Sequence, residues 1–345
     1  MRYDIMRRCV DKRSLAYLIA ALALLLLFAA NLLYGSIDIP AGDVLSIVTG
    51  GECGRDIWRV VVLETRLPQA LTALLSGAAI SVAGLLLQTL FRNPLAGPEV
   101  LGVNSGAGLG VAVVMLCTGG VSAFGLGGYL AVLGGAFAGA LSVILIILLL
   151  ATLLRNNMFL LIAGVAVSYI TSSVITLLNY FSTAEGVHSY MVWGMGSFGG
   201  VSIGQMPFFA SVALLLLLVS FVMAKPLNTL LLGDAYAHNL GVNVKSVRAV
   251  ALCVTGLLAA VVTAFCGPVS FIGLAVPHIA RISLRSSNHR HLVPSVAMLG
   301  GAVALLCNLV CQLPGENGLL PLGAITPLIG APVIIYVVVK NRGVD

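Results

Sequence analysis

Apolar stretches long enough to cross a lipid bilayer recur along the whole chain. The hydrocarbon core is about 30 Å thick, and a helix needs roughly 20 apolar residues to span it. Only 9% of the 345 residues are charged while 59% are hydrophobic, too few charges for an aqueous surface. The runs at 14–34 and 141–154 lack the polar–apolar alternation of a β-barrel. The chain is therefore predicted to be an all-α polytopic membrane protein.

About ten transmembrane helices are predicted in a single membrane domain covering residues 1–345. They lie near 15–34, 67–90, 99–117, 128–154, 158–180, 206–224, 248–267, 269–284, 292–312 and 321–339. Only CGPVS separates the seventh from the eighth. The basic start resembles a signal peptide, but its apolar centre is too long and no small-residue cleavage site follows. We expect a retained first helix preceded by a cytoplasmic tail at 1–13.

Basic residues predict the orientation of these helices. An even number of spans places both termini on one side, and loops rich in Lys and Arg stay in the cytoplasm. With the N-terminus inside, only Arg55, Arg59 and Arg66 of the 18 Lys and Arg residues fall outside. Both termini are thus expected in the cytoplasm. The net charge of +6 reflects this orientation and predicts no nucleic-acid partner.

Glycine is abundant, with 39 residues and dense runs at 102–110 and 134–139, which favours close helix packing. A weak echo relates NPLAGPEVLG near residue 93 to CGPVSFIGLAVP near 266, since each places Gly-Pro before an apolar segment. Such an echo is typical of transporters built from two related halves. We expect a weak two-half internal repeat.

The acidic residues indicate no proton relay. Every Asp and Glu, Glu99 included, is expected in a tail, a loop or a helix end, and none at the membrane midplane. None of the four lysines follows a glycine, so the chain lacks the usual ATP-binding loop. The seven cysteines form no C-x-x-C pair, and Cys307 and Cys311 favour helix packing over metal binding. We predict no catalytic residue, bound cofactor or metal.

The longest inner loop, at 225–248, is the predicted contact for a separate energising subunit. Its sequence is KPLNTLLLGDAYAHNLGVNVKSVR. Asp234 is expected to be the N-cap of a short helix over AYAHNL, and Gly241 to end that helix. A solvated connector is the alternative interpretation. We expect a short cytoplasmic helix that can transmit force.

With this inner loop and the motifs given below, the chain resembles the FecCD-type permeases, the membrane subunits of type II ABC importers for siderophore-iron, haem and cobalamin. The likeness runs nearly end to end and is specific because its motifs occur together in order. They are RLPQ at 66–69, QTLFRNPLAGPEVLGVNSGAGLG at 88–110, LIAGVAVS at 161–168, WGMGSFGGV at 193–201, LNTLLLGDAYAHNLGV at 227–242, GPVSFIGLAVPHIAR at 267–281 and LPLGAITPLIGAPVI at 320–334.

The resemblance implies an assembly in the bacterial inner membrane. It implies a homodimer around a central pathway, with two cytoplasmic ATPase subunits that use ATP and Mg. It also implies a periplasmic or lipid-anchored substrate-binding protein on the outer side and contact with membrane lipid. The chain itself would be no enzyme. Which chelate is carried is left open, because siderophore-iron, haem and cobalamin permeases share these motifs.

The resemblance also assigns roles to matching residues. The loop after the second helix and the loop before the fifth narrow the inner end of the pathway, and their residues are Asn93, Pro94, Leu95, Asn157 and Met158. The ATPase-coupling pattern GD-x-x-A-x-x-LG is carried by Gly233, Asp234, Ala237, Leu240 and Gly241. Asn93-Pro94 could also be only a turn at a helix end. His278 is interpreted as satisfying backbone groups near Pro277, in preference to ligating haem.

Docking of the binding protein is where the chain departs from the family. The usual RLPR offers two outward arginines, whereas this chain has Arg66 and Gln69. Gln312 stands where the cobalamin permease used for comparison has a basic residue, and Arg59 is a possible substitute. Rim charges mainly steer encounter, so docking can survive their loss.

Two other classes of function stay open. A secondary carrier or passive channel would act without an ATPase. The absence of buried carboxylates in the predicted helices argues against a proton-coupled carrier. A membrane scaffold or sensor would transport nothing. Co-purification of an ATPase in mild detergent separates these classes from an importer.

Overall fold

The computed structural model describes residues 2–117, 126–154, 157–313 and 318–341, and this part of the chain is helical with no strand. Eight longer helices are α1 (Arg2–Leu33), α4 (Leu67–Phe91), α6 (Leu126–Leu153), α7 (Asn157–Phe181), α9 (Met206–Val222), α12 (Val244–Cys266), α14 (His289–Gln312) and α15 (Leu322–Asn341). Shorter ones are α2 (Ala41–Val48), α3 (Asp56–Val60), α5 (Val103–Cys117), α8 (Ala184–Met195), α10 (Ala224–Leu230), α11 (Asp234–Asn239) and α13 (Ile272–Leu284). A π-helical turn η1 (Val61–Arg66) and the 3₁₀ turns η2 (Pro98–Leu101) and η4 (Phe198–Gly200) complete the description.

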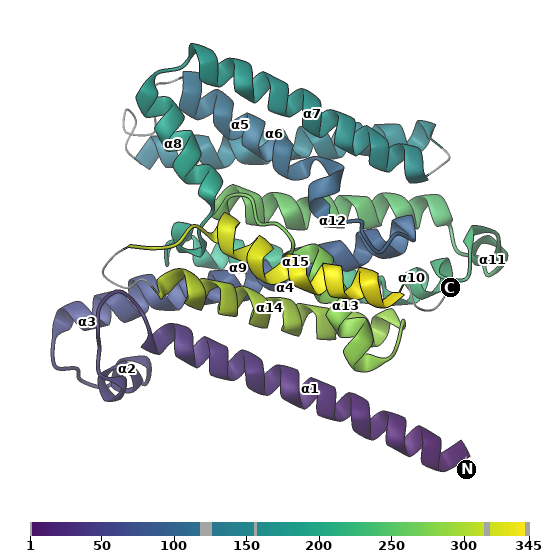
Figure 1. Ribbon diagram of the computed structural model, residues 1–345, viewed down its shortest axis with the longest axis horizontal. Coiled ribbons are helices and arrows are strands. Elements are labelled where there is room, and N and C mark those ends of the chain that lie inside the picture. Colours follow the sequence, from purple (N-terminus) through teal and green to yellow (C-terminus); the bar gives the residue numbers. More distant parts are fainter. Residues whose placement is uncertain (1, 118–125, 155–156, 314–317, 342–345) are drawn as a thin grey trace.

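The long helices lie roughly side by side in one bundle (Figure 1). Helices α5, α6 and α7 form one edge, α1 forms the opposite edge, and α4, α9, α12, α13, α14 and α15 lie between them. The start of α1 and the end of α15 lie at the same end of the bundle as α11, which we call the α11 end. Helices α2, α3 and α8 lie at the other end, called the α2–α3 end.

All ten predicted segments fall on helices, which confirms the all-helical membrane architecture. Six helices of the described chain are long and apolar enough to cross a bilayer, or seven if α9 and α10, bent by 50° at their junction, form one span. Three further apolar helices are shorter, at Val103–Cys117, Ile272–Leu284 and Leu322–Tyr336. The number of actual crossings and the side of the termini stay predictions.

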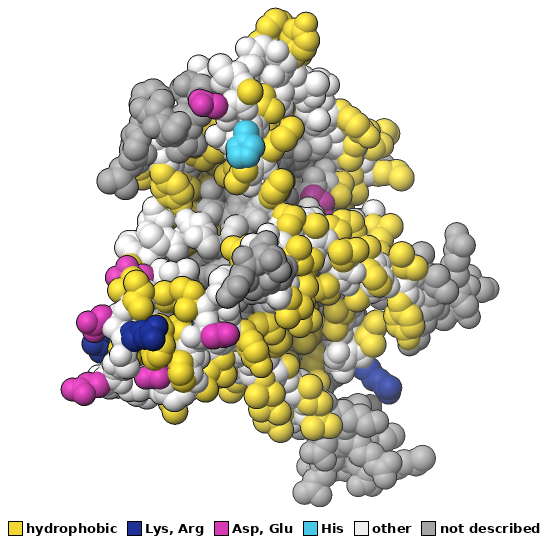
Figure 2. All heavy atoms as spheres, turned by 60° about the vertical axis from the view of Figure 1, so that its left-hand side comes forward, with side chains coloured by type: hydrophobic (Ala, Val, Ile, Leu, Met, Phe, Trp, Pro, Cys, Tyr) yellow, Lys and Arg dark blue, Asp and Glu magenta, His cyan; other side chains and the backbone are white. Residues whose placement is uncertain are grey.

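Helix α4 is the centre of the packing. Every residue from Ser76 to Phe91 is buried, and the helix contacts α9, α12, α13 and α14. The edge helices differ, since only 17% of the apolar windows of α1 and α7 is buried. Their outward side chains, such as Leu22 and Leu25 of α1 at 56% and 64% exposure, suit a lipid environment. Figure 2 shows hydrophobic side chains over much of the surface.

Glycines bring helices α5 and α6 into backbone contact. A Cβ on Gly110 would lie 1.9 Å from the carbonyl oxygen of Gly135, and one on Gly139 would lie 2.0 Å from that of Gly106. The predicted role of the two glycine runs in close packing is therefore confirmed at these pairs. Gly134 of the same run has open space at its Cβ position.

The break between the seventh and eighth predicted helices is real. Helix α12 ends at Cys266, Gly267 has φ +74°, and α13 begins at Ile272 after Phe271 with φ +66°. The two segments with the Gly-Pro echo meet in space, because a Cβ on Gly273 would lie 3.0 Å from Cδ of Pro98. The internal repeat itself stays a prediction.

Several helical segments lie where loops were expected, among them α2, α3 with η1, and α8. Residues 56–91 form one continuous helical stretch through α3, η1 and α4, although Asp56, Arg59 and Glu64 suggested a loop. Arg and Glu are good helix formers, so their charge disfavours a position in hydrocarbon without excluding a helix. Helix α8 is capped by Thr183, whose hydroxyl accepts a hydrogen bond from the Gly186 N–H at 3.2 Å.

Candidate functional site

Helix α11 is the short helix expected in the loop at 225–248, and its C-terminus is as predicted. The Gly241 N–H donates to the His238 carbonyl at 2.9 Å and the Val242 N–H to the Ala237 carbonyl at 3.0 Å, the paired bonds of a Schellman motif. Gly241 has φ +79°, a conformation that glycine adopts without strain. The helix therefore ends sharply and can act as a compact unit.

The predicted N-cap of α11 is wrong by one residue. Gly233, with φ +110°, occupies the N-cap, and Asp234 is the first helical residue. The Asp234 carboxylate instead accepts hydrogen bonds from the guanidinium groups of Arg92 and Arg248. The sequence pattern missed this because two distant arginines, invisible to local capping rules, bind that carboxylate.

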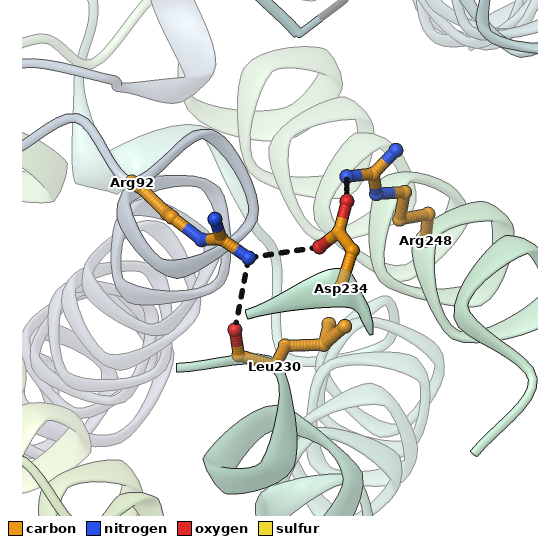
Figure 3. A network of polar contacts seen from close by, with 4 residues as sticks. All are labelled: Arg92, Leu230, Asp234 and Arg248. Atoms are coloured by element: carbon orange, nitrogen blue, oxygen red, sulfur yellow. Dashed lines mark hydrogen bonds and ion pairs between the residues drawn. The ribbon is translucent and has the colours of Figure 1, made fainter. Parts of the chain in front are cut away.

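Asp234 is held between Arg92 at the end of α4 and Arg248 in α12 (Figure 3). Arg92 Nη2 lies 2.8 Å from Asp234 Oδ1, and Arg248 Nη2 lies 2.5 Å from Oδ2. The same Arg92 nitrogen donates to the carbonyl of Leu230, the last residue of α10, at 3.2 Å. These three charged residues, called the Asp234 clasp, join the α10–α11 segment to two long helices.

Apolar side chains of the α10–α11 segment face solvent at the α11 end. Leu232, Tyr236 and Leu240 are 62%, 66% and 61% exposed, whereas Ala237 is fully buried against the bundle. Exposed apolar groups outside the spanning segments are typical of protein interaction sites. The helix thus presents Tyr236 and Leu240 while Ala237 anchors it.

The predicted gate residues Asn93, Pro94 and Leu95 form a defined turn. The Asn93 Oδ1 accepts a hydrogen bond from the Leu95 N–H at 2.9 Å, and the Leu95 side chain is 51% exposed. His278 Nε2 lies 3.0 Å from the Pro94 carbonyl oxygen. The interpretation of His278 as a residue that satisfies a backbone group is confirmed, although the group belongs to this turn and not to the Pro277 break.

The second predicted gate element lies at the start of α7, at the same end of the bundle as α11 (Figure 1). Met158 is 69% exposed. The side chain of Asn157 lies outside the described residues. The role of Asn157 and Met158 in narrowing a pathway stays a proposal.

At the α2–α3 end, the expectation that Arg66 points outward is wrong. Its side chain is 4% exposed, and its guanidinium donates to the carbonyls of Leu32 and Leu33 at 2.8 Å each and to that of Ile37. The last carbonyls of a helix lack partners within it and attract a cation, which explains the inward position. Arg59 is exposed.

The two glutamines predicted for docking also lie below the surface. Gln69 is half-buried and its Nε2 donates to Asn308 Oδ1 at 3.0 Å, while Asn308 Nδ2 donates to Asn31 Oδ1 at 2.7 Å. Gln312 is 8% exposed. Gln69 and Asn308 line a cavity of about 200 Å³. The amides of Gln69, Asn308 and Asn31 join α4, α14 and α1 by hydrogen bonds within this chain.

Glu99 lies deeper in the bundle than expected. Its turn η2 contacts α13 through Pro98 and Gly273, and Gly273 packs on Ile80 and Gly84 of α4. Seven to eleven residues separate these α4 positions from Phe91, or about 10–16 Å at 1.5 Å per residue. The half-buried carboxylate lines an open groove of about 400 Å³ with Ser105, Ser168, Tyr169 and Ser172.

Arg92 and Arg248 are the site residues that sequence reasoning missed. In the sequence both residues contribute only to the Lys and Arg bias that predicts the orientation. No pattern of neighbouring residues relates positions 92, 234 and 248. Their charge, opposite to that of Asp234, was the available signal. It gained meaning only once the fold brought α4, α11 and α12 together.

Comparisons with known proteins agree with this architecture. The model of the FecCD transport family matches residues 23–340. The chain is 36% identical to a vitamin B12 import system permease protein BtuC from Citrobacter koseri, over 97% of both chains. It is 37% identical to the BtuC of Salmonella enteritidis, over 96% of this chain and 97% of the relative.

A solved structure resembles the fold over nearly the whole chain. It shows a metal-chelate type ABC transporter in an inward-facing conformation, with a TM-score of 0.82 and 27% sequence identity. The superposition covers 95% of this chain and 99% of the other. With the family match and the two curated relatives, it leads to one conclusion. The chain belongs to the FecCD transport family.

Proposed function

We propose that this chain is the permease of an ABC importer that moves cobalamin or an iron chelate across the bacterial inner membrane. It acts as a homodimer of ten-span subunits with cytoplasmic termini. Two ATPase subunits bind at the α11 end and hydrolyse ATP with Mg. A substrate-binding protein delivers cargo at the α2–α3 end.

The observation that carries the proposal is the build of α11. A compact helix with a sharp C-terminus projects Tyr236 and Leu240 into solvent, while its other face is fixed by the buried Ala237 and the Asp234 clasp. A channel acting alone has no use for a rigid apolar contact outside the membrane. An external subunit that pushes on the bundle does.

Cobalamin is the first cargo to test, because the relatives at 36% and 37% identity are vitamin B12 permeases. An iron chelate is the second, because the similar solved structure is of the metal-chelate type. Both are bulky, and a pathway with few charges can pass such cargo without trapping it. Selection rests with the binding protein.

The gate assignment is part of the proposal. In the homodimer, Asn93, Pro94 and Leu95 of each copy face the pathway near Asn157 and Met158. The turn at Asn93 is held at Pro94 by His278 and adjoins Arg92. It is therefore a firm element that moves with its neighbours.

The test is reconstitution of the chain with its co-purifying ATPase into vesicles, with the binding protein and labelled cyanocobalamin or iron chelate outside. Uptake is expected only with ATP and Mg inside. The Leu240→Asp variant should lose ATPase binding because a charge replaces an apolar contact. Its matched control is Leu45→Asp in α2, which places the same charge at an equally exposed apolar position at the opposite end of the bundle and should retain ATPase binding. Uptake without an ATPase would instead support a secondary carrier or channel.

A further inference from the structure

We propose that the Asp234 clasp is the link through which movement of α11 reaches the turn of the proposed gate residues Asn93, Pro94 and Leu95, called the gate turn. Arg92 is the positioning residue that transmits this movement. The inference rests on the proposed function, since it assumes that a partner moves α11. It changes the role of Asp234. The carboxylate is a tether within this chain and not a contact for the ATPase.

The occupancy of the carboxylate is the first reason. Each oxygen of Asp234 is bound by a different guanidinium, at 2.8 Å by Arg92 and at 2.5 Å by Arg248. Two guanidinium charges already offset the charge of this carboxylate, which weakens its attraction for a cation on a partner. The exposed Tyr236 and Leu240 are available to that partner instead.

The position of Arg92 is the second reason. It ends α4 in a left-handed conformation with φ +47°, and the next residue along the chain is Asn93 of the gate turn. Arg92 Nη2 donates to the Leu230 carbonyl of α10 and to the Asp234 carboxylate of α11, so one nitrogen links the end of α10 to the start of α11 (Figure 3). A shift of α11 therefore acts on the residue that adjoins the gate.

The two arms of the clasp differ in what they connect. Arg248 ties Asp234 to α12, a helix that is largely buried from Ala251 onward. That arm keeps α11 seated on the bundle. Arg92 ties Asp234 to the end of α4, where the chain turns into Asn93, and only this arm leads to the gate.

The energy of the clasp suits transmission more than stability. The side chains of Arg92, Asp234 and Arg248 are 49%, 45% and 27% exposed, and ion pairs that water reaches contribute little to the stability of a fold. Removing one arm should leave the fold intact. The loss should appear in the coupling between ATP hydrolysis and gate movement.

The experiment follows the gate directly. Leu95→Cys is introduced after Cys9, Cys53, Cys117 and Cys253 are replaced by serine, and the permease with its co-purified ATPase is placed in nanodiscs. The rate of Leu95→Cys labelling by N-ethylmaleimide is measured with and without ATP and vanadate. With Arg92 present, nucleotide should change this rate at least about threefold. With Arg92→Gln the change should vanish, while ATP hydrolysis stays within about twofold.

Arg285→Gln is the matched control. Arg285 ends α13 with the same φ of +47°, is exposed, and makes no ion pair among the described residues. The Arg285→Gln variant should keep the full nucleotide-dependent change in the labelling rate at position 95. Arg92→Lys restores a positive charge opposite Asp234 and should recover part of it.

The outcomes separate the two proposals. If labelling in the parent protein ignores nucleotide, or no ATPase co-purifies, the proposed function fails. If the parent responds and Arg92→Gln responds equally, the clasp is not the link and the proposed function stands. Size-exclusion profiles and the amount of bound ATPase show that each variant is folded and assembled.

Discussion

The backbones of Gly84 in α4 and Gly273 in α13 touch. A Cβ atom on Gly84 would lie 1.9 Å from the carbonyl oxygen of Gly273 and 2.6 Å from its carbonyl carbon. Because the obstacle is backbone, no side-chain rotation can relieve such a clash. The contact joins α4, the most buried helix of the described chain, to α13, whose His278 contacts the Pro94 carbonyl of the proposed gate turn.

Gly84→Ala is therefore expected to destabilise the bundle. Overpacking a tight interior costs about 1–3 kcal/mol, which should lower the melting temperature in detergent by several degrees. The control is Gly134→Ala, which adds the same methyl group in α6 where the Cβ position is open. Since alanine is the better helix former, that variant should melt at the parent temperature or above it. Equal melting temperatures for both variants would refute the close crossing.

Much of the fold follows from local sequence. Apolar length predicts the helices, and the glycine runs predict the close approach of α5 and α6. Gly241 predicts the end of α11, because a left-handed residue is required there and glycine provides it. Each of these properties depends on residues near one another in the chain, so sequence alone carries the information.

The binding partners of the charged side chains depend on the fold, so they could not be predicted from neighbouring residues in the sequence. Arg66 was expected to face a docking protein, yet it binds carbonyls 29–34 residues earlier in the chain. Asp234 was expected to cap its own helix, yet it binds Arg92, 142 residues away. The depth of Glu99 likewise depends on how α13 packs on α4. Hydropathy and helix-capping rules use only residues that are close together in the chain, so they predict none of these contacts.

The buried position of Arg66 predicts a structural phenotype. Arg66→Gln removes the cation that satisfies the last carbonyls of α1, and a buried acceptor left unpaired costs about 1–3 kcal/mol. We expect a clear fall in melting temperature. Arg59→Gln, at an exposed position, should change stability by less than about 0.5 kcal/mol and instead slow association with the binding protein at low salt. If Arg66→Gln weakened that association without altering the melting temperature, Arg66 would be a docking residue after all.

Glu99 offers a test between an importer and a proton-coupled carrier. A carboxylate within the membrane is often a proton site in secondary carriers, whereas ATP supplies the energy in the proposed function. Glu99→Gln, of nearly equal shape, should therefore keep ATP-driven cobalamin uptake in vesicles within about threefold. Uptake driven by an imposed pH gradient in the parent protein, abolished in Glu99→Gln, would favour the carrier.

The orientation of the chain decides whether α11 can meet an ATPase. The bias of Lys and Arg predicts that the α11 end lies in the cytoplasm. Leu240→Cys and Glu52→Cys provide exposed thiols at the two ends of the bundle, in the background that lacks Cys9, Cys53, Cys117 and Cys253. With the permease expressed alone in cells with a permeabilised outer membrane, a membrane-impermeant maleimide should label position 52 at once. Position 240 should react only after the inner membrane is opened. Labelling of position 240 from outside would reverse the orientation, and α11 could then neither contact a cytoplasmic ATPase nor drive the gate.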